Sequence, residues 1–114
     1  MNKELIEKSE QDLIVAKKFT KIHQSARSRD LEFAMTLREV KRLLNCKTCY
    51  FTGKPLNNIE GDPLQLTFDR IDNTKGYVNG NVVACSNEFN NIKDNITIEQ
   101  VRLMVKAFKR KKIW

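Results

Sequence analysis

Hydrophobic residues recur at helical spacing through the first part of the chain. From about Lys3 to Ala26 no glycine or proline interrupts the sequence, and its main apolar residues are Leu5, Ile6, Leu13, Ala16, Phe19 and Ile22. Apolar residues three or four positions apart share one face, so this segment predicts an amphipathic helix. Asp30 is a candidate N-cap for a second helix, whose apolar stripe would end near Leu44. The stripes predict core packing or a surface for a partner helix, including a homodimer contact.

After Asn45 the pattern changes to that of strands and turns. Residues 64–68 alternate apolar and polar side chains, as a half-buried strand does, and residues 81–85 form a second β-prone run. A polar loop with two glycines (73–80) lies between them. Ser86 can cap a helix that follows at once. This order predicts a hairpin-like pair of strands that leads directly into a short helix.

A last helix is predicted from Thr97, where Thr-x-x-Gln forms a capping box. Its apolar stripe is Val101, Met104, Val105 and Phe108. We therefore expect an α+β fold in a single domain, 1–114. The domain would comprise a helical N-terminal part (1–45), a hairpin-and-helix core (46–95), and a packing helix with a basic tail (96–114).

Length and composition fit one globular domain. A chain of 114 residues that was divided into two cores would leave both undersized. Hydrophobic residues make up 40% of the chain and charged residues 31%, which is the balance of a soluble protein. The N-terminal residues are charged, and no apolar run is long enough to cross a bilayer. We expect a cytoplasmic protein without a membrane partner.

The charge balance favours a polyanionic partner. Lysine and arginine number 21 against 14 aspartates and glutamates, which gives a net charge of +7. Basic side chains gain affinity for nucleic acid by releasing condensed counterions from phosphates, whereas the alternative is a surface charge that only keeps the protein in solution. The basic residues gather at the end of the chain, at Lys106, Lys109, Arg110, Lys111 and Lys112. This clustering favours nucleic acid, with a frayed, solvated end as the alternative.

Three cysteines make a poor disulfide framework. Cys46 and Cys49 form a C-x-x-C half-site, but a structural zinc site needs four ligands, usually from two such pairs. Cys85 and a distant histidine do not complete one, so structural Zn²⁺ is not expected. A thioredoxin-like role lacks its βαβ context.

One acid and one amide suggest a metal site. Asp69 ends the first predicted strand, and Asn90 lies near the start of the helix after the second. A carboxylate and a carbonyl oxygen suit Mg²⁺ or Mn²⁺, hard cations that fill their remaining positions with water and phosphate oxygens. Such an ion could stabilise the leaving oxygen of a phosphodiester.

From Cys49 to Lys93 the chain resembles the HNH (ββα-metal) endonuclease superfamily. The resemblance is carried by C-Y-F-T-G-K-P-L, T-F-D-R-I-D-N, G-Y-V-N-G-N-V-V and N-E-F-N-N-I-K. It is strongest to small phage-encoded HNH proteins with a D-R-I-D…G-Y…N-V…N-x-x-K pattern, which implies a phage protein in the cytoplasm of a bacterial host. The resemblance implies that Asp69 and Asn90 are metal ligands and that Asn81 braces the loop.

Two features depart from the family pattern. Arg70 stands where the family has its general-base histidine, and arginine cannot accept a proton. Arg70 would instead bind the scissile phosphate, leaving water activation to Asp72 or to the metal, although Asp72 with Asn73 also fits an Asx turn. Of the four zinc-ligand positions of relatives, only one is a cysteine here. We expect the hairpin to be held by packing of Phe51, Phe68, Val83 and Phe89.

The remaining candidate residues would contact nucleic acid, with DNA favoured over RNA. They are Lys75, Tyr77, Lys93, Lys109, Arg110, Lys111 and Lys112. Tyr77 could stack on a base or pack over the loop, and Lys93 could contact phosphate or lie along its helix. The sequence thus favours a metal-dependent endonuclease or nickase. The alternative is a catalytically inactive HNH-like phage protein that binds nucleic acid or inhibits a host defence protein.

Overall fold

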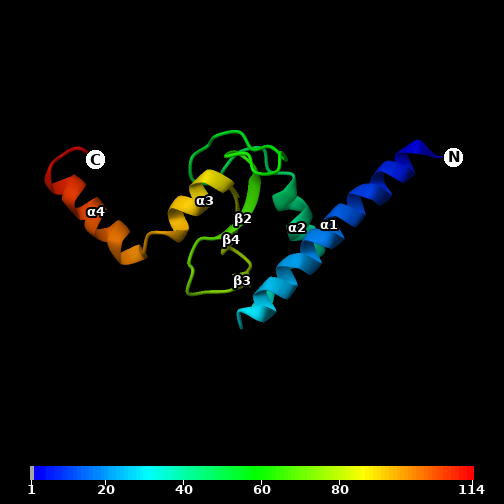
Figure 1. Ribbon diagram of the computed structural model, residues 1–114, viewed down its shortest axis with the longest axis horizontal. Helices are drawn as coiled ribbons and strands as arrows, with labels where there is room; N and C mark the ends of the chain where they lie inside the picture. Colours follow the sequence, from blue (N-terminus) through cyan, green and yellow to red (C-terminus); the bar gives the residue numbers. More distant parts are fainter. Residues whose placement is uncertain (1) are drawn as a thin grey trace.

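Helix α1 (Lys3–Ser28) is the longest element of the computed structural model, which describes residues 2–114. The helix begins where the Asn2 side chain accepts a hydrogen bond from the Leu5 N–H. Its C-terminal half packs on the rest of the molecule, whereas its N-terminal half projects into solvent (Figure 1). The predicted first helix is therefore present and extends slightly beyond Ala26.

The predicted second helix starts later than expected. Asp30 does not cap a helix, because its backbone is left-handed (φ 54°) and belongs to the turn that ends α1. Strand β1 (Phe33–Ala34) follows, and helix α2 (Leu37–Leu44) begins after the true N-cap, Thr36. Strand β1 pairs in parallel with β3 (Tyr77–Val78). This pairing partner lies far along the chain, which is why local spacing could not reveal the break in the helix.

The hairpin and its following helix form as predicted. Strands β2 (Leu66–Arg70) and β4 (Val82–Ser86) pair antiparallel, with Asp69 opposite Val83. Helix α3 (Asn87–Asp94) starts directly after β4 and packs on both strands, and the Ser86 hydroxyl accepts a hydrogen bond from the Phe89 N–H. The fold is α+β, with small sheets and four helices among the described residues.

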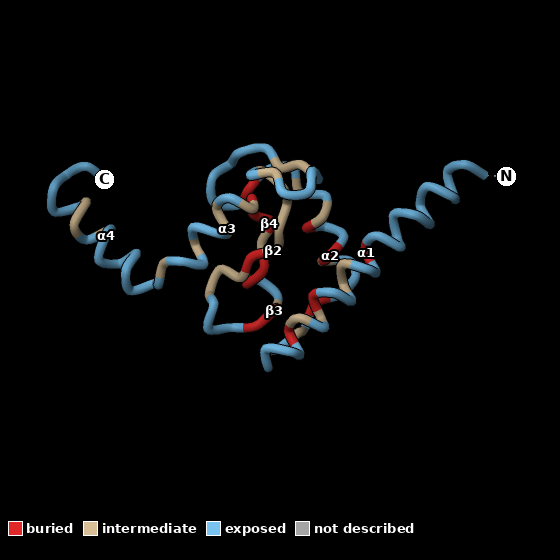
Figure 2. Tube along the Cα trace, in the orientation of Figure 1, coloured by how far each residue is buried: buried red, intermediate tan, exposed pale blue. Residues whose placement is uncertain are grey.

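The core lies where α1, α2 and the hairpin meet. Figure 2 shows the buried residues gathered at this junction, with both ends of the chain exposed. Its members include Ile22, Ala26, Val40, Leu43, Val82 and Ala84, and Phe68 packs against them. On the far side of the hairpin, the rings of Phe51 and Phe89 stack with centroids 5.0 Å apart. Burial of the core residues is what holds the hairpin on α1 and α2. Phe51, which was predicted to help hold the hairpin, remains 37% exposed.

Helix α4 (Ile98–Arg110) has the predicted capping box but not the predicted packing. Thr97 and Gln100 each accept a hydrogen bond from the other's backbone N–H. The helix projects from the body of the molecule (Figure 1), and no residue of it is buried in the described structure. Its apolar stripe was expected to pack on the core and does not; one of its members, Phe108, stacks on Trp114 instead. No helix in residues 2–114 combines the length and the apolar character that crossing a bilayer requires.

Candidate functional site

Asp69 is a buried carboxylate near the end of β2. Only 4% of the residue is exposed, and its Oδ2 has no hydrogen-bond partner within residues 2–114. Burial raises the pKa of the Asp69 carboxyl, and the nearby Lys93 ammonium lowers it by less. A buried carboxylate with an unsatisfied oxygen destabilises the folded chain, and such groups concentrate at functional sites.

Lys93 of α3 provides the positive charge nearest to Asp69. Its Nζ lies 3.4 Å from Asp69 Oδ2 and donates a hydrogen bond to the Arg70 carbonyl oxygen at 2.7 Å. The ammonium therefore ties α3 to the end of β2. We expected Lys93 on a phosphate or along its own helix, and the structure instead gives it partners inside the chain.

Asn90 lies one turn before Lys93 and faces the same strand. Its Nδ2 donates to Thr67 Oγ1 at 3.1 Å, and Thr67 Oγ1 donates in turn to the Cys85 carbonyl. Thr67 and Asp69 are two apart on β2, so both side chains point to the face that α3 covers. The amide and the carboxylate therefore lie on one face of the hairpin. The sequence reasoning missed Thr67, which period-two spacing from Asp69 could have found.

The donor set at this face is small. No group of three histidine, cysteine, aspartate or glutamate side chains suited to a metal occurs in the described chain. Asp69 offers Oδ2, and the Asn90 amide is oriented through Nδ2, so its Oδ1 is the atom left for a cation. Two oxygens from the protein fit Mg²⁺ or Mn²⁺, which retain several water or phosphate ligands, and would not form a closed zinc site.

Arg70 turns away from this face toward the loop after β2. Its Nη1 donates to the backbone carbonyls of Asn73 (2.9 Å) and Lys75 (2.7 Å), and its guanidinium lies over the Tyr77 ring. We expected this side chain to bind the scissile phosphate. In the structure its first contacts hold the loop backbone in place.

Asp72 forms the Asx turn that the sequence offered as the alternative to catalysis. Its Oδ1 accepts hydrogen bonds from both the backbone N–H and the hydroxyl of Thr74. The hydrogen bond from the Thr74 hydroxyl is the main cause that lowers the pKa of the Asp72 carboxyl. A carboxylate with a lowered pKa is a weak proton acceptor, so the geometry argues against the predicted role in water activation.

Asn81 joins the two ends of the loop. Its Oδ1 accepts from the Asp72 N–H (2.9 Å), and its Nδ2 donates to the carbonyls of Asp72 (3.1 Å) and Gly76 (2.9 Å). A Cβ at Gly76 would collide with the backbone of Glu32, because β1 approaches the loop closely there. The buried Asn81 amide and the absence of a side chain at Gly76 thus set the path of the loop beside the candidate site.

Tyr77 is a packing residue. It is 8% exposed, its hydroxyl accepts a hydrogen bond from Arg29, and the guanidinium groups of Arg29 and Arg70 lie over its ring. Of the two alternatives that the sequence offered for Tyr77, packing over the loop is the one that this burial favours. Its burial follows from the pairing of β3 with β1, which local sequence did not predict.

The basic residues of the chain do not gather at Asp69. Lys109, Arg110, Lys111 and Lys112 are exposed at the far end of α4, away from the hairpin (Figure 1). Lys75 is exposed in the loop. Two lysines that sequence reasoning missed, Lys18 and Lys21 of α1, line a pocket with Thr67, Phe68 and Tyr77.

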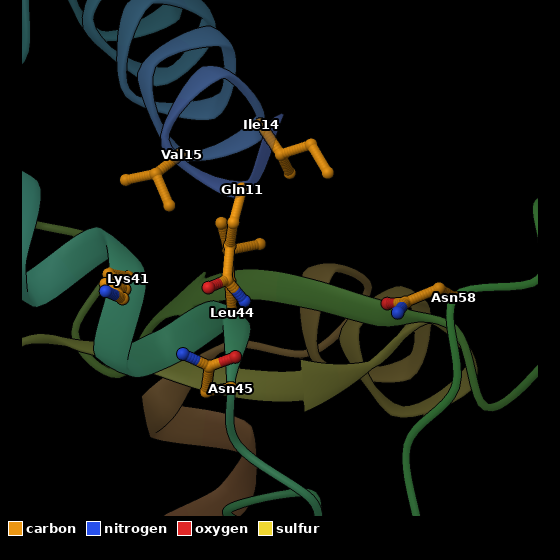
Figure 3. Close-up of a pocket in the computed structure, with 7 residues that line it drawn as sticks. All are labelled: Gln11, Ile14, Val15, Lys41, Leu44, Asn45 and Asn58. Carbon is orange, nitrogen blue, oxygen red and sulfur yellow. The ribbon is translucent and has the colours of Figure 1, made fainter. Parts of the chain in front are cut away.

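Another pocket lies between α1 and the end of α2 (Figure 3). It is lined by Gln11, Ile14, Val15, Lys41, Leu44, Asn45 and Asn58. These side chains are aliphatic or amide apart from Lys41, and none is a carboxylate, thiol or imidazole. This pocket therefore offers no group for acid–base or nucleophilic chemistry.

The two thiols that lie close together are not those of the C-x-x-C pattern. Cys49 and Cys85 are buried with Sγ atoms 3.8 Å apart, whereas the Cys46 thiol contacts the Arg42 carbonyl. Burial raises the pKa of the Cys49 thiol, but hydrogen bonds from Thr52, Ser86 and Phe51 outweigh it and set the pKa at about 6. Burial and the neighbouring Cys49 raise the pKa of Cys85 to about 12. All three cysteines are free.

Comparison with known proteins finds relatives of this chain in viruses. It is similar to an uncharacterized 29.0 kDa protein in the dda-modA intergenic region of Enterobacteria phage T4, with 36% identity over 78 residues. It is also similar to uncharacterized protein R423 of Acanthamoeba polyphaga mimivirus, with 30% identity over 91 residues. The aligned regions cover 68% and 80% of this chain but only 31% and 16% of the two relatives. No protein-family profile matches the chain, and no solved structure matches it. The chain is thus an α+β protein with phage and giant-virus relatives.

Proposed function

We propose that the protein is an HNH-type metal-dependent endonuclease or nickase that hydrolyses nucleic-acid phosphodiesters, with DNA as the favoured substrate. The observation that carries this proposal is Asp69, whose buried Oδ2 is paired with the Lys93 ammonium at 3.4 Å but has no aligned hydrogen bond among the described residues. Asp69 is the penultimate residue of β2, in a hairpin that leads into α3, the helix that bears Asn90 and Lys93. A strand-end acid beside a helix amide is the arrangement that the resemblance requires.

In this proposal Asp69 Oδ2 and Asn90 Oδ1 would hold one Mg²⁺ or Mn²⁺. When bound, the ion would stabilise the negative charge that develops on the leaving oxygen and would lower the pKa of a water ligand. The other roles belong to the chain. Lys93 would leave Asp69 Oδ2 for a phosphate oxygen, because an ammonium and a divalent cation repel each other at one carboxylate. Asn81 and Arg70 would hold the loop that flanks the substrate.

Plasmid cleavage tests the proposal. Supercoiled plasmid incubated with the protein and Mg²⁺ or Mn²⁺ should be nicked, and Asp69→Ala and Asn90→Ala should each abolish nicking. Glu99→Gln is the matched control, because Glu99 is an exposed acid on α4, and it should cut like the wild type. A wild type that does not cut, or cutting that persists in Asp69→Ala, would overturn the assignment.

A second measurement does not depend on activity. A divalent cation that binds only the folded state raises the melting temperature. Mn²⁺ should therefore raise the melting temperature of the wild type and of Glu99→Gln, and leave Asp69→Ala unchanged. An equal rise in all three proteins would place the ion elsewhere.

One observation favours a non-enzymatic alternative. The Lys93 ammonium, 3.4 Å from Asp69 Oδ2, already stands where a cation would be attracted. In that case the fold would bind nucleic acid or a host defence protein without turnover. Wild type and Asp69→Ala would then be equally inert as nucleases, equally insensitive to Mn²⁺, and equally able to retard DNA in a gel at low salt.

A further inference from the structure

Two apolar helix faces lie outside the core at opposite ends of the molecule, and on one of them, that of α4, the Trp114 ring stacks on Phe108 with centroids 6.4 Å apart. The α1 stripe consists of Leu5, Ile6, Ser9 and Leu13, and these residues line a shallow hollow with Glu10. The α4 stripe consists of Val101, Met104, Val105 and Phe108. Leu13 is 54% exposed and Met104 is 46% exposed, although both lie in regular helices with apolar neighbours. Contiguous apolar surface of this kind marks an interaction site.

The two faces carry opposite charge. Residues 3–14 hold four acids against two lysines, and residues 98–112 hold six basic residues against one acid. At about 100° per residue, Glu10 and Asp12 fall on either side of the α1 stripe. By the same spacing, Lys109 and Lys111 fall on either side of the α4 stripe. An apolar stripe edged by acids therefore meets its complement in an apolar stripe edged by lysines.

The faces also match in length but cannot meet within one molecule. Twelve residues of α1 and thirteen of α4 span about 18 Å and about 20 Å at 1.5 Å per residue. The body of the protein separates them, since the molecule is 65 Å long and carries one face at each end (Figure 1). A second copy placed antiparallel to the first would carry the complementary face at each end.

We propose that two copies of this chain form a closed dimer in which the α1 stripe of each packs against the α4 stripe of the other. Two-fold symmetry makes both contacts identical and leaves neither face open, so the assembly stops at two. A stable interface buries about 1,600 Å² in total, and each helix pair would supply about half of it. This inference is independent of the proposed nuclease activity, because neither stripe includes Asp69 or Asn90.

Charge reversal tests this pairing directly. One variant carries Glu10→Lys with Asp12→Lys, and the other carries Lys109→Glu with Lys111→Glu. The wild type should sediment as a dimer at micromolar concentration, each variant alone should sediment as a monomer, and an equal mixture of the two variants should be dimeric again. The mixture regains affinity because each contact then joins one acidic and one basic face.

The controls separate the stripes from general charge effects. Glu4→Lys with Glu7→Lys makes the same charge change on the opposite side of α1 and should leave the protein dimeric. Met104→Asp should give a monomer. Its circular dichroism spectrum should match that of the wild type, and so should its melting temperature at concentrations where both proteins are monomeric, because the Met104 side chain is exposed and does not contribute to the core. A monomeric wild type, a dimeric Met104→Asp, or a mixture that stays monomeric would each overturn the proposal.

Discussion

Asp69 occupies an environment that is unfavourable for its ionised form. The side chain is buried, one oxygen lacks a hydrogen bond, and one ammonium 3.4 Å away gives partial compensation. Groups held in such surroundings reduce stability and persist where a function requires them. The residue is thus a place where stability and function should respond in opposite directions to one substitution.

Asp69→Asn should stabilise the metal-free protein at neutral pH by roughly 1 kcal/mol, because it removes the desolvated charge. The folded-state pKa of Asp69 is raised, so its stabilising contribution is complete below the unfolded pKa and is lost as pH rises through the folded pKa. Urea unfolding in chelator at several pH values measures this. Asp72→Asn is the control. Because the pKa of Asp72 is lowered, the contribution of this carboxyl to the free energy of unfolding should change with pH in the opposite direction. An Asp69→Asn protein less stable than wild type would mean that the ion pair with Lys93 outweighs burial.

Cys49 should titrate near neutral pH. Its pKa of about 6 means that the folded thiol ionises below the unfolded one, so its contribution to stability grows as pH rises from about 6 to about 9 and is lost as pH falls. The ultraviolet absorbance of the thiolate should show this step in the wild type and in Cys46→Ser. The step should vanish in Cys49→Ser. A single thiolate transition at alkaline pH would contradict the prediction.

Asn81→Ala should cost about 2–3 kcal/mol, because three backbone groups of the loop lose their partner and two of them are carbonyls beside a buried position. Equilibrium unfolding in urea gives this value. Asn58→Ala, at an exposed amide, should change stability by less than about 0.5 kcal/mol. Equal effects at the two positions would show that Asn81 does not hold the loop.

At single positions, sequence pattern and structure agree where the signal is local. The strand-end acid Asp69 and the capping residues Ser86 and Thr97 lie where spacing placed them. By sequence, Tyr77 and Lys93 are each either a contact for nucleic acid or a packing residue, and in the structure both have partners within the chain. Those partners, Arg29 for Tyr77 and β2 for Lys93, are brought near by tertiary packing, which no local pattern encodes.

Among the elements, the short parallel pair β1–β3 has the largest effect on the rest of the fold. It interrupts what spacing predicted as one helix from Asp30 to Leu44, and it buries Tyr77. The apolar residues at 31–37 fit a helix as well as a strand, so the outcome depends on hydrogen-bond partners at Tyr77 and Val78. Helix spacing is informative about long segments and does not register a two-residue strand.

Gly76→Ala should disrupt this pair. The added Cβ would collide with the Glu32 backbone, so β1 must move away or the loop must refold, at a cost of about 3 kcal/mol or more. Gly61→Ala is the control: unlike Gly76, Gly61 has a left-handed backbone (φ 79°), but the space around it is open. Gly61→Ala should cost only about 1–2 kcal/mol. Thermal unfolding of both variants makes the comparison, and equal losses would refute the close-approach argument.

At the scale of the whole molecule, the buried core and the exposed helix α4 occupy different regions. The core occupies the junction of α1, α2 and the hairpin, and α4 lies outside it (Figure 2). The sequence predicted that α4 exists, because its capping box and stripe are local. It could not predict that the stripe does not pack on the core, because the same pattern describes a helix packed on a core and a helix that awaits another surface.

Removal of residues 97–114 should leave the remaining chain folded, with its melting temperature unchanged within a few degrees at sub-micromolar concentration. The reason is that α4 buries no residue in the described structure. Circular dichroism and thermal unfolding of the shortened chain measure this. Removal of residues 3–28 is the contrasting case and should unfold the protein, because α1 contributes Ile22 and Ala26 to the core.

The β1–β3 pair also bears on how the chain reaches its native state. Phe33 and Tyr77 are neighbours in the sheet but lie far apart in sequence, so their meeting closes a long loop and is entropically expensive at an early stage. Folding should therefore be slower than in a helical bundle of equal size, with the hairpin forming first and the N-terminal segment docking last. A single backbone cleavage in the exposed stretch around Glu60 would separate α1, β1 and α2 from the hairpin and α3, so the two fragments would be held together mainly by the β1–β3 pair and by the packing of α2 on β4.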